Sequence, residues 1–263
     1  MSGLRLNVPV IAVLGWKKTG KTLLAESLIR SLRKEGYRVA SGKHVAEKGF
    51  SIDREGSDSW RHRMAGASKV VLASERETSI LSFEGAISLQ DLLSYAEGCD
   101  VMVLEGFSTI VASDPKVGKI LCFKEEREKK NFNLTPPVIG FYSPLEDEGN
   151  VKLNTLVKDA LEYVRRESEV LSNLSSLPGL NCGKCGYPSC RKFAEALWKG
   201  ETTRERCEVG KNVKLSLKVD GVEIPLQPFV SEIIRRGVLG MVSTLKKVSV
   251  KGDENVAVEI RGI

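Results

Sequence analysis

The sequence predicts an α/β protein built on a parallel sheet, followed by two smaller units. Three observations support this fold class. Apolar strand-like segments alternate with amphipathic segments over residues 1–172, which is typical of a parallel sheet covered by helices. A glycine-rich loop joins the first strand to the first helix. Four cysteines then follow a serine-rich break, outside the alternating pattern.

The composition is that of an ordinary globular protein. With 263 residues, 41% of them hydrophobic and 28% charged, the chain has room for one well-cored domain and a smaller one. The net charge of +6 is spread along the chain without a basic stripe of interleaved aromatics, so we expect no nucleic-acid binding. The apolar stretch at residues 8–15 is too short to cross a bilayer. We therefore expect a cytoplasmic protein without membrane contact.

The first elements are a strand at residues 8–15 and a helix that follows a glycine loop. Apolar residues of the helix recur at helical spacing, namely Leu23, Leu24, Leu28 and Leu32. The loop carries G-x-x-x-x-G-K-T, the phosphate-loop pattern of P-loop NTPases, from Gly15 to Thr22. Its amides point at phosphate oxygens, Lys21 pairs with the terminal phosphates, and the Thr22 hydroxyl ligates Mg²⁺. The pattern therefore predicts nucleotide binding on a P-loop NTPase-type sheet.

In addition to Thr22, an acidic residue is needed near the metal ion, and residues 100–107 (DVMVLEGF) supply one. Glu105 is expected at the carboxyl end of this strand, beside the phosphate loop, whereas Asp100 begins the strand at the far end of the sheet. We predict Lys21 and Glu105 as catalytic residues, and Thr22 and Glu105 as Mg²⁺ ligands. The alternative is that Glu105 only caps the next turn.

The remaining elements continue the alternation. Strands are predicted at residues 39–45, 69–74, 119–123 and 137–143, and helices at 88–98 and 153–171. We assign all these strands to the parallel sheet. The helix at 153–171 closes a nucleotide-binding domain of residues 1–172.

Three stretches together resemble the MobB family of molybdopterin guanine dinucleotide biosynthesis, namely residues 15–22, 42–74 and 103–107, and the resemblance covers about residues 8–170. The resemblance implies a P-loop homodimer that binds GTP, hydrolyses it slowly at most, and assists a separate MobA-like guanylyltransferase acting on molybdopterin. By position it assigns nucleotide contacts to Gly15, Lys17, Thr19, Gly20, Lys21, Thr22 and Asp53. Further matches to its motifs are Lys43, His44, Gly56, Asp58, Ser59, Arg63, Ala65, Gly66, Ala67 and Gly106.

The chain departs from the family pattern in two places. Residues 45–48 lack the further histidines that commonly follow His44, and Ser57 stands where a lysine is common. Independently of the family, residues 52–59 group the carboxylates of Asp53, Glu55 and Asp58 in a Gly/Ser-rich loop that could respond to a bound nucleotide. His62 fits an outer helix face better than a site. The guanine signature N-K-x-D is absent, so the preference for GTP over ATP rests on the resemblance alone.

The cysteine unit begins after a linker at residues 173–180. Cys182, Cys185, Cys190 and Cys207 have the spacing C-x₂-C-x₄-C-x₁₆-C, with a helix predicted after Cys190. Disulfides are disfavoured in a cytoplasmic protein, and zinc prefers two C-x-x-C pairs, although it stays an alternative. The segment also resembles the four-cysteine domain of RnfB-type electron-transfer subunits and corrinoid iron–sulfur proteins. We predict a [4Fe–4S] module at residues 181–210.

The tail, residues 211–263, predicts a ββαβ unit. A turn at Asp220-Gly221 separates two alternating runs, a helix begins at Pro228, and a final strand is expected at 255–262. The helix is expected to pack an apolar face, containing Phe229, Ile233, Met241 and Leu245, against the small sheet. Its predicted role is structural.

Taken together, these patterns predict a GTP-binding accessory protein of molybdenum or tungsten cofactor biosynthesis, at most a slow GTPase, with a fused iron–sulfur module. Two other functions stay open. The cysteines could hold cargo in a nucleotide-driven metal or cluster delivery protein. A small-molecule kinase is less compatible, because no arginine-rich lid is recognisable.

Overall fold

The computed structural model describes residues 8–83, 87–207, 209, 215–219, 222–224, 226 and 228–245. The chain divides into two compact units, Met1–Arg165 and Arg166–Ile263. The division falls inside a continuous helix, so the domain limits at 172 and 180 stay a prediction. Within the described residues, no helix is long and apolar enough to span a membrane.

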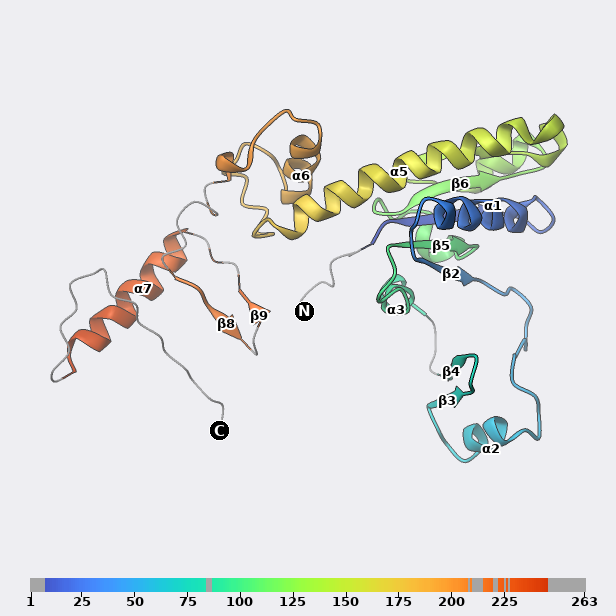
Figure 1. Cartoon of the computed structure of the whole chain (residues 1–263), viewed down its shortest axis with the longest axis horizontal. Helices are drawn as coiled ribbons and strands as arrows, with labels where there is room; N and C mark the ends of the chain where they lie inside the picture. The colour runs from blue at the N-terminus through green and yellow to red at the C-terminus, as the bar shows by residue number, and fades with distance from the viewer. Residues whose placement is uncertain are drawn as a thin grey trace. The chain divides into compact units, whose positions relative to one another are not determined.

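The first unit is built on five parallel strands, which confirms the predicted α/β class (Figure 1). They are β1 (Val10–Gly15), β2 (Val39–Lys43), β5 (Val101–Glu105), β6 (Gly118–Cys122) and β7 (Val138–Tyr142). The spatial order is β2-β5-β1-β6-β7, and every neighbouring pair is parallel. The phosphate-loop strand β1 is therefore central, with the Glu105 strand β5 beside it.

Helices cover both faces of this sheet. α1 (Lys21–Lys34) and the first half of α5 (Val151–Ser175) share one core with the strands, and α3 (Leu89–Ser94) and α4 (Ser108–Val111) share the other. Short 3₁₀ turns lie at Glu126–Asn131, Pro144–Glu146 and Glu148–Asn150. The sheet is thus buried on both faces, as parallel sheets are.

Strand β1 shows how the sequence pattern produces this layering. Ile11 and Val13 belong to the core under α1. The alternate residues of the strand, Val10, Ala12 and Leu14, belong to the core on the opposite face. A strand buried on both sides needs no polar alternation, which explains its continuous apolar run. On α1, the predicted core residues at positions 24, 28 and 32 are buried, but the prediction for Leu23 is wrong, because its side chain is 47% exposed.

One predicted strand lies outside the parallel sheet. β3 (Lys69–Ala73) pairs antiparallel with β4 (Thr78–Ser82), a strand that the sequence did not predict, in a separate two-stranded sheet next to α2 (Asp58–Met64). The prediction of a parallel partner for residues 69–74 is therefore wrong. The physical reason is the connection, because residues 74–77 allow a hairpin but not the long crossover that parallel pairing requires.

The second unit has a small core. The last turns of α5 pack against α6 (Cys190–Trp198), and the buried residues are Val170, Leu177, Phe193 and Ala194. A 3₁₀ turn at Arg204–Arg206 leads to Cys207. Among the described residues, this cluster and the buried Leu171 and Ala196 make a small core, so a further constraint on the module is expected.

The tail is described in part. β8 (Lys218–Val219) and β9 (Val222–Glu223) form the predicted antiparallel hairpin, and α7 (Pro228–Ser243) is the predicted helix. The turn at Asp220-Gly221 and the strand predicted at 255–262 lie outside the described residues. The expected packing of the apolar helix face is not found. Its residues are 55–72% exposed, because neither described strand covers them, and Leu245 lies beyond the end of the helix.

Candidate functional site

The phosphate loop connects β1 to α1 through two glycines with positive φ. Gly15 has a φ of 139°, and a Cβ there would lie 2.1 Å from the backbone carbonyl oxygen of Cys122. Gly20, with a φ of 85°, precedes the first residue of α1, Lys21. Both positions therefore require glycine, one for space and one for backbone conformation. The first amides of α1 are left free to meet an anion.

Side chains of the loop hold its shape. Thr19 is buried, and its hydroxyl donates to the Trp16 carbonyl at 2.9 Å. The Lys21 ammonium donates to the same carbonyl. Burial lowers the pKa of Lys21, while the charge of Glu105 partly opposes this. Lys21 is thus folded back on the backbone of its own loop.

Glu105 lies where the strand pattern places it. Its side chain is 14% exposed at the carboxyl end of β5, and Oε1 accepts a hydrogen bond from the Thr22 hydroxyl at 2.8 Å. The neighbouring α4 has no side-chain cap, so the alternative role of Glu105 in capping the next turn is not what the structure shows. Asp100, at the other end of β5, binds Arg38 instead.

Lys43 completes this group. Its ammonium lies 3.0 Å from both carboxylate oxygens of Glu105 and 3.4 Å from the Thr22 hydroxyl. The ammonium therefore contacts the two residues predicted as Mg²⁺ ligands. The family motifs included Lys43, but the sequence analysis assigned no role to it. The signal that could have found it is strand position, because Lys43 ends β2 and pairs in register with Glu105.

The loop at residues 53–59 bonds within itself. Asp53 Oδ1 accepts hydrogen bonds from the hydroxyls of Ser57 (2.9 Å) and Ser59 (2.6 Å), and these bonds lower the Asp53 pKa. Ser57 is the N-cap of α2, and its hydroxyl accepts from the Trp60 amide. The Asp53 carboxylate is thus engaged by its own loop rather than by the phosphate loop. Its nucleotide contact stays a prediction.

The other motif residues of this segment shape the chain around the site. The His44 amide donates to the Glu105 carbonyl at 2.9 Å, and its ring packs on Phe107 with 5.4 Å between centroids. Arg63 lies over the Phe83 ring, and Gly66 has a φ of 105°. His62 is exposed on α2. His44 thus borders the site, whereas His62 lies on an outer helix face.

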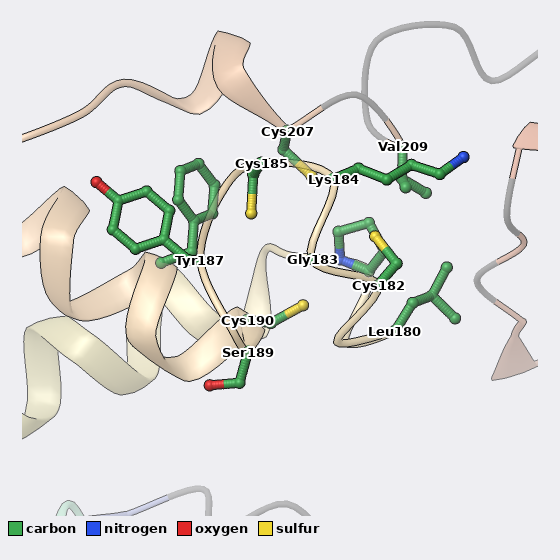
Figure 2. A pocket seen from close by; sticks show the side chains of 12 residues that line it. Leu180, Cys182, Gly183, Lys184, Cys185, Tyr187, Ser189, Cys190, Cys207 and Val209 are labelled. Carbon is green, nitrogen blue, oxygen red and sulfur yellow. The ribbon is translucent and has the colours of Figure 1, made fainter.

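The four module cysteines line one pocket. Cys182, Cys185, Cys190 and Cys207 surround it together with Tyr187 and Phe193 (Figure 2). Figure 2 shows the sulfur atoms of Cys185 and Cys190 turned into this space. All four are half-buried, and each of the chain's six cysteines is free. The four cysteines that the spacing predicted as one site thus border a common pocket, and their role as metal ligands stays a prediction.

The pocket gathers the ligand type that two kinds of metal centre use. Thiolates bind zinc in structural sites, and they bind the irons of an iron–sulfur cluster, one cysteine to each iron. Within the described residues, no group of three Cys, His, Asp or Glu side chains stands close enough together to hold a metal ion. The four cysteines that line the pocket therefore fit either centre in their ligand type.

An ion pair fixes α6 against α5. Arg191 donates to both carboxylate oxygens of Glu167, at 2.6 and 2.8 Å, and the Glu167 side chain is only 5% exposed. Arg191 directly follows Cys190 in sequence, whereas Glu167 lies on α5. Spacing along the chain gave no signal for it, since 24 residues separate the partners.

We expect Glu167→Gln to loosen this module, because it leaves the guanidinium of Arg191 against a neutral partner. Arg191 is 28% exposed and can regain water, so the cost is about 1–3 kcal/mol. Amide exchange over residues 190–198 should then become about tenfold faster or more. Glu169→Gln, at an exposed site on the same helix, is the matched control. Equal exchange in both variants would contradict the structural role.

The other two cysteines differ from this set. Cys122 is buried in β6, and burial raises the pKa of its thiol to about 12. Cys99 is half-buried just before β5. A thiol that stays protonated is a poor metal ligand. Cys122 thus acts as a small apolar side chain of the core.

Comparison with known proteins gives matches to both units. Residues 177–209 match a family model described as "Putative Fe-S cluster". A component of the ion-translocating oxidoreductase complex of Thiobacillus denitrificans is 45% identical over 49 residues, which are 18% of this chain and 26% of that protein. The crystal structure of Bacillus subtilis MobB is similar with a TM-score of 0.46 at 18% identity, over 59% of this chain and 98% of that one.

Two further matches cover most of the first unit and 95% of the chain, respectively. Residues 10–143 match the model for MobB, described as molybdopterin guanine dinucleotide synthesis protein B. A Methanocaldococcus jannaschii protein named "Putative molybdopterin-guanine dinucleotide biosynthesis adapter protein" is 32% identical over 253 residues, which are 95% of this chain and 97% of that protein. The family model spans half of the chain and this relative spans nearly all of it, so the chain belongs to the MobB family.

Proposed function

We propose that this protein is a GTP-binding adapter in molybdenum or tungsten cofactor biosynthesis, which assists the attachment of GMP to molybdopterin. The observation that carries the proposal is the grouping of Thr22, Glu105 and Lys43 beside the phosphate loop, in a chain of the MobB family. The nucleotidyl transfer itself belongs to a MobA-like guanylyltransferase partner. Chemistry in this chain is limited to slow GTP hydrolysis.

The phosphate end of the nucleotide is held by the loop and α1. Lys21 exchanges the Trp16 carbonyl for phosphate oxygens, which are stronger acceptors for a charged donor. The residues we assign to nucleotide binding are Gly15, Lys17, Thr19, Gly20, Lys21, Thr22 and Asp53. Thr22 and Glu105 are the proposed Mg²⁺ ligands, and the ion would neutralise phosphate charge when bound. Asp53 requires a rearrangement of its loop to take part.

Lys43 has to leave the Glu105 carboxylate before a metal ion can bind there. Its side chain is 56% exposed, so the ammonium can move into solvent. We expect Lys43→Met to lower the Mg²⁺ concentration that half-saturates GTP binding by about twofold to fivefold, because an exposed ion pair is worth up to about 1 kcal/mol. The measurement is a Mg²⁺ titration with a fluorescent GTP analogue. Lys34→Met, at the exposed end of α1, is the control, and an unchanged or higher Mg²⁺ requirement would contradict the expectation.

The module at residues 181–210 is proposed to hold a [4Fe–4S] cluster through Cys182, Cys185, Cys190 and Cys207. The cluster would add a redox or structural centre, and the cysteine pocket above a small core supports its presence. The α6 helix begins at Cys190, so the positive end of its dipole would lie beside this thiolate. Zinc in the same pocket is the outcome that metal analysis would have to exclude.

A homodimer is also proposed. Support comes from the β3–β4 hairpin, on which Val71, Leu72 and Ile80 are 42–64% exposed. A two-stranded sheet with exposed apolar residues is marginally stable alone and gains from pairing with another chain. We place the complex in the cytoplasm.

The function is tested by binding and by loss of the product. The purified protein should bind GTP more tightly than ATP and should associate with a guanylyltransferase of the pathway. Deletion of its gene should lower the amount of the guanine dinucleotide form of the cofactor. A protein that binds neither GTP nor that enzyme, or a deletion that leaves cofactor levels unchanged, rejects the proposal. Cluster transfer to acceptors that depends on GTP hydrolysis would instead indicate a delivery protein.

A further inference from the structure

Asn181 is joined to Cys190 by two hydrogen bonds. The Asn181 backbone amide donates to the Cys190 sulfur at 3.4 Å, and the Asn181 side-chain oxygen accepts from the Cys190 amide at 2.8 Å. Among the described residues, Cys190 is the module cysteine whose sulfur accepts a hydrogen bond. The residue before the first cysteine of the motif thus holds the third.

This position makes three demands on its residue. The φ of Asn181 is 49°, in the left-handed region that glycine, asparagine and aspartate tolerate best. The bond from the Cys190 amide needs a side-chain acceptor, which excludes glycine. A neutral acceptor avoids adding negative charge beside thiolates, which excludes aspartate. Asparagine is the residue that meets all three.

The two bonds have different consequences for Cys190. Its amide is the first of α6 and has no partner inside the helix, so the Asn181 oxygen fixes the start of the helix and the direction of the side chain. The amide that points at the sulfur stabilises negative charge there. A reduced cluster carries one more negative charge than an oxidised one, so such a bond favours the reduced state.

We propose that Asn181 is a positioning residue of the metal site, which holds Cys190 in place and, as a neutral acceptor, keeps the reduction potential of the cluster higher than a charged acceptor would. This inference rests on the proposed iron–sulfur module. It concerns a residue that binds no metal itself and acts through the Cys190 amide and sulfur.

Two variants separate the effects. Asn181→Gly keeps the left-handed backbone and the amide directed at sulfur but removes the side-chain bond. The site should then lose its metal to a chelator several-fold faster. Asn181→Asp keeps both bonds and adds a charge, so at a fixed solution potential the ratio of reduced to oxidised cluster should fall about tenfold, which is 59 mV for one electron. Asn154→Asp, at an exposed site on α5, is the matched control.

Iron, sulfide and zinc contents of the wild-type protein come first. If the wild type holds zinc, the cluster part of the proposed function and the potential fail, and the chelator assay alone tests the positioning role. A wild type that holds no metal rejects both proposals. With a cluster present, wild-type metal retention in Asn181→Gly together with a wild-type potential in Asn181→Asp overturns this inference. Circular dichroism of each variant excludes loss of α6 as the cause.

Discussion

Replacing Lys21 by alanine is expected to weaken GTP binding by about one hundredfold. Lys21 is the first residue of α1, and its ammonium is the part-buried charge beside the free amides of the loop. A charged hydrogen bond to phosphate in such a place contributes about 2–4 kcal/mol, which corresponds to a factor of roughly 30 to 1,000. Equilibrium binding of fluorescent GTP and ATP analogues measures it.

The variant should still fold, because α1 is anchored by Leu24, Leu28 and Leu32, which are buried further along the helix. Lys34→Ala, at the last turn of the same helix, is the control that keeps the net charge equal. If Lys21→Ala binds both nucleotides as the wild type does, the nucleotide site is not at this loop and the proposed function fails.

Replacing Cys185 by serine is expected to abolish the iron–sulfur cluster. Serine offers a hydroxyl that stays protonated at neutral pH, whereas the cluster needs a thiolate. Cys185 packs against the core around Phe193. Serine is nearly the same size as cysteine, so the substitution tests the ligand without reshaping the pocket. Anaerobic purification with iron and sulfide analysis and a visible spectrum measures the loss.

Cys99→Ser is the matched control, since it makes the same chemical change outside the pocket and should leave the spectrum unchanged. Wild-type iron and sulfide in Cys185→Ser would remove this residue from the ligand set. Zinc without sulfide in the wild type would instead indicate a structural metal, and then the same substitution should reduce zinc binding.

The geometry of the phosphate loop and of the proposed metal ligands could largely be predicted from the sequence. The loop needs glycine where φ is positive or the backbone approaches closely, and it needs a lysine at the start of the helix. These requirements involve residues that are close along the chain, so a short motif is enough to predict them. Glu105 could be predicted because a carboxylate after an apolar strand has a known place in a parallel sheet. Lys43 was harder, since its contact with Glu105 depends on which strands are neighbours.

The departures from prediction have the same origin. Residues 69–73 have the composition of a buried strand, but composition does not indicate which strand lies beside it. The short turn after residue 73 leads to antiparallel pairing with β4. Leu23 and the apolar residues of α7 follow helical spacing but are exposed. Helical spacing alone does not indicate which residues of a helix pack against another element. In each case the missing information was a contact between distant segments.

The sequence by itself determined the phosphate loop, the parallel alternation and the four cysteines, because each depends on residues that are close along the chain. Only the tertiary structure decided that Lys43 meets Glu105, that Asn181 holds Cys190 and that Glu167 pairs with Arg191. Such pairs form when packing brings separate elements to within hydrogen-bond distance, and local propensity carries no record of that packing.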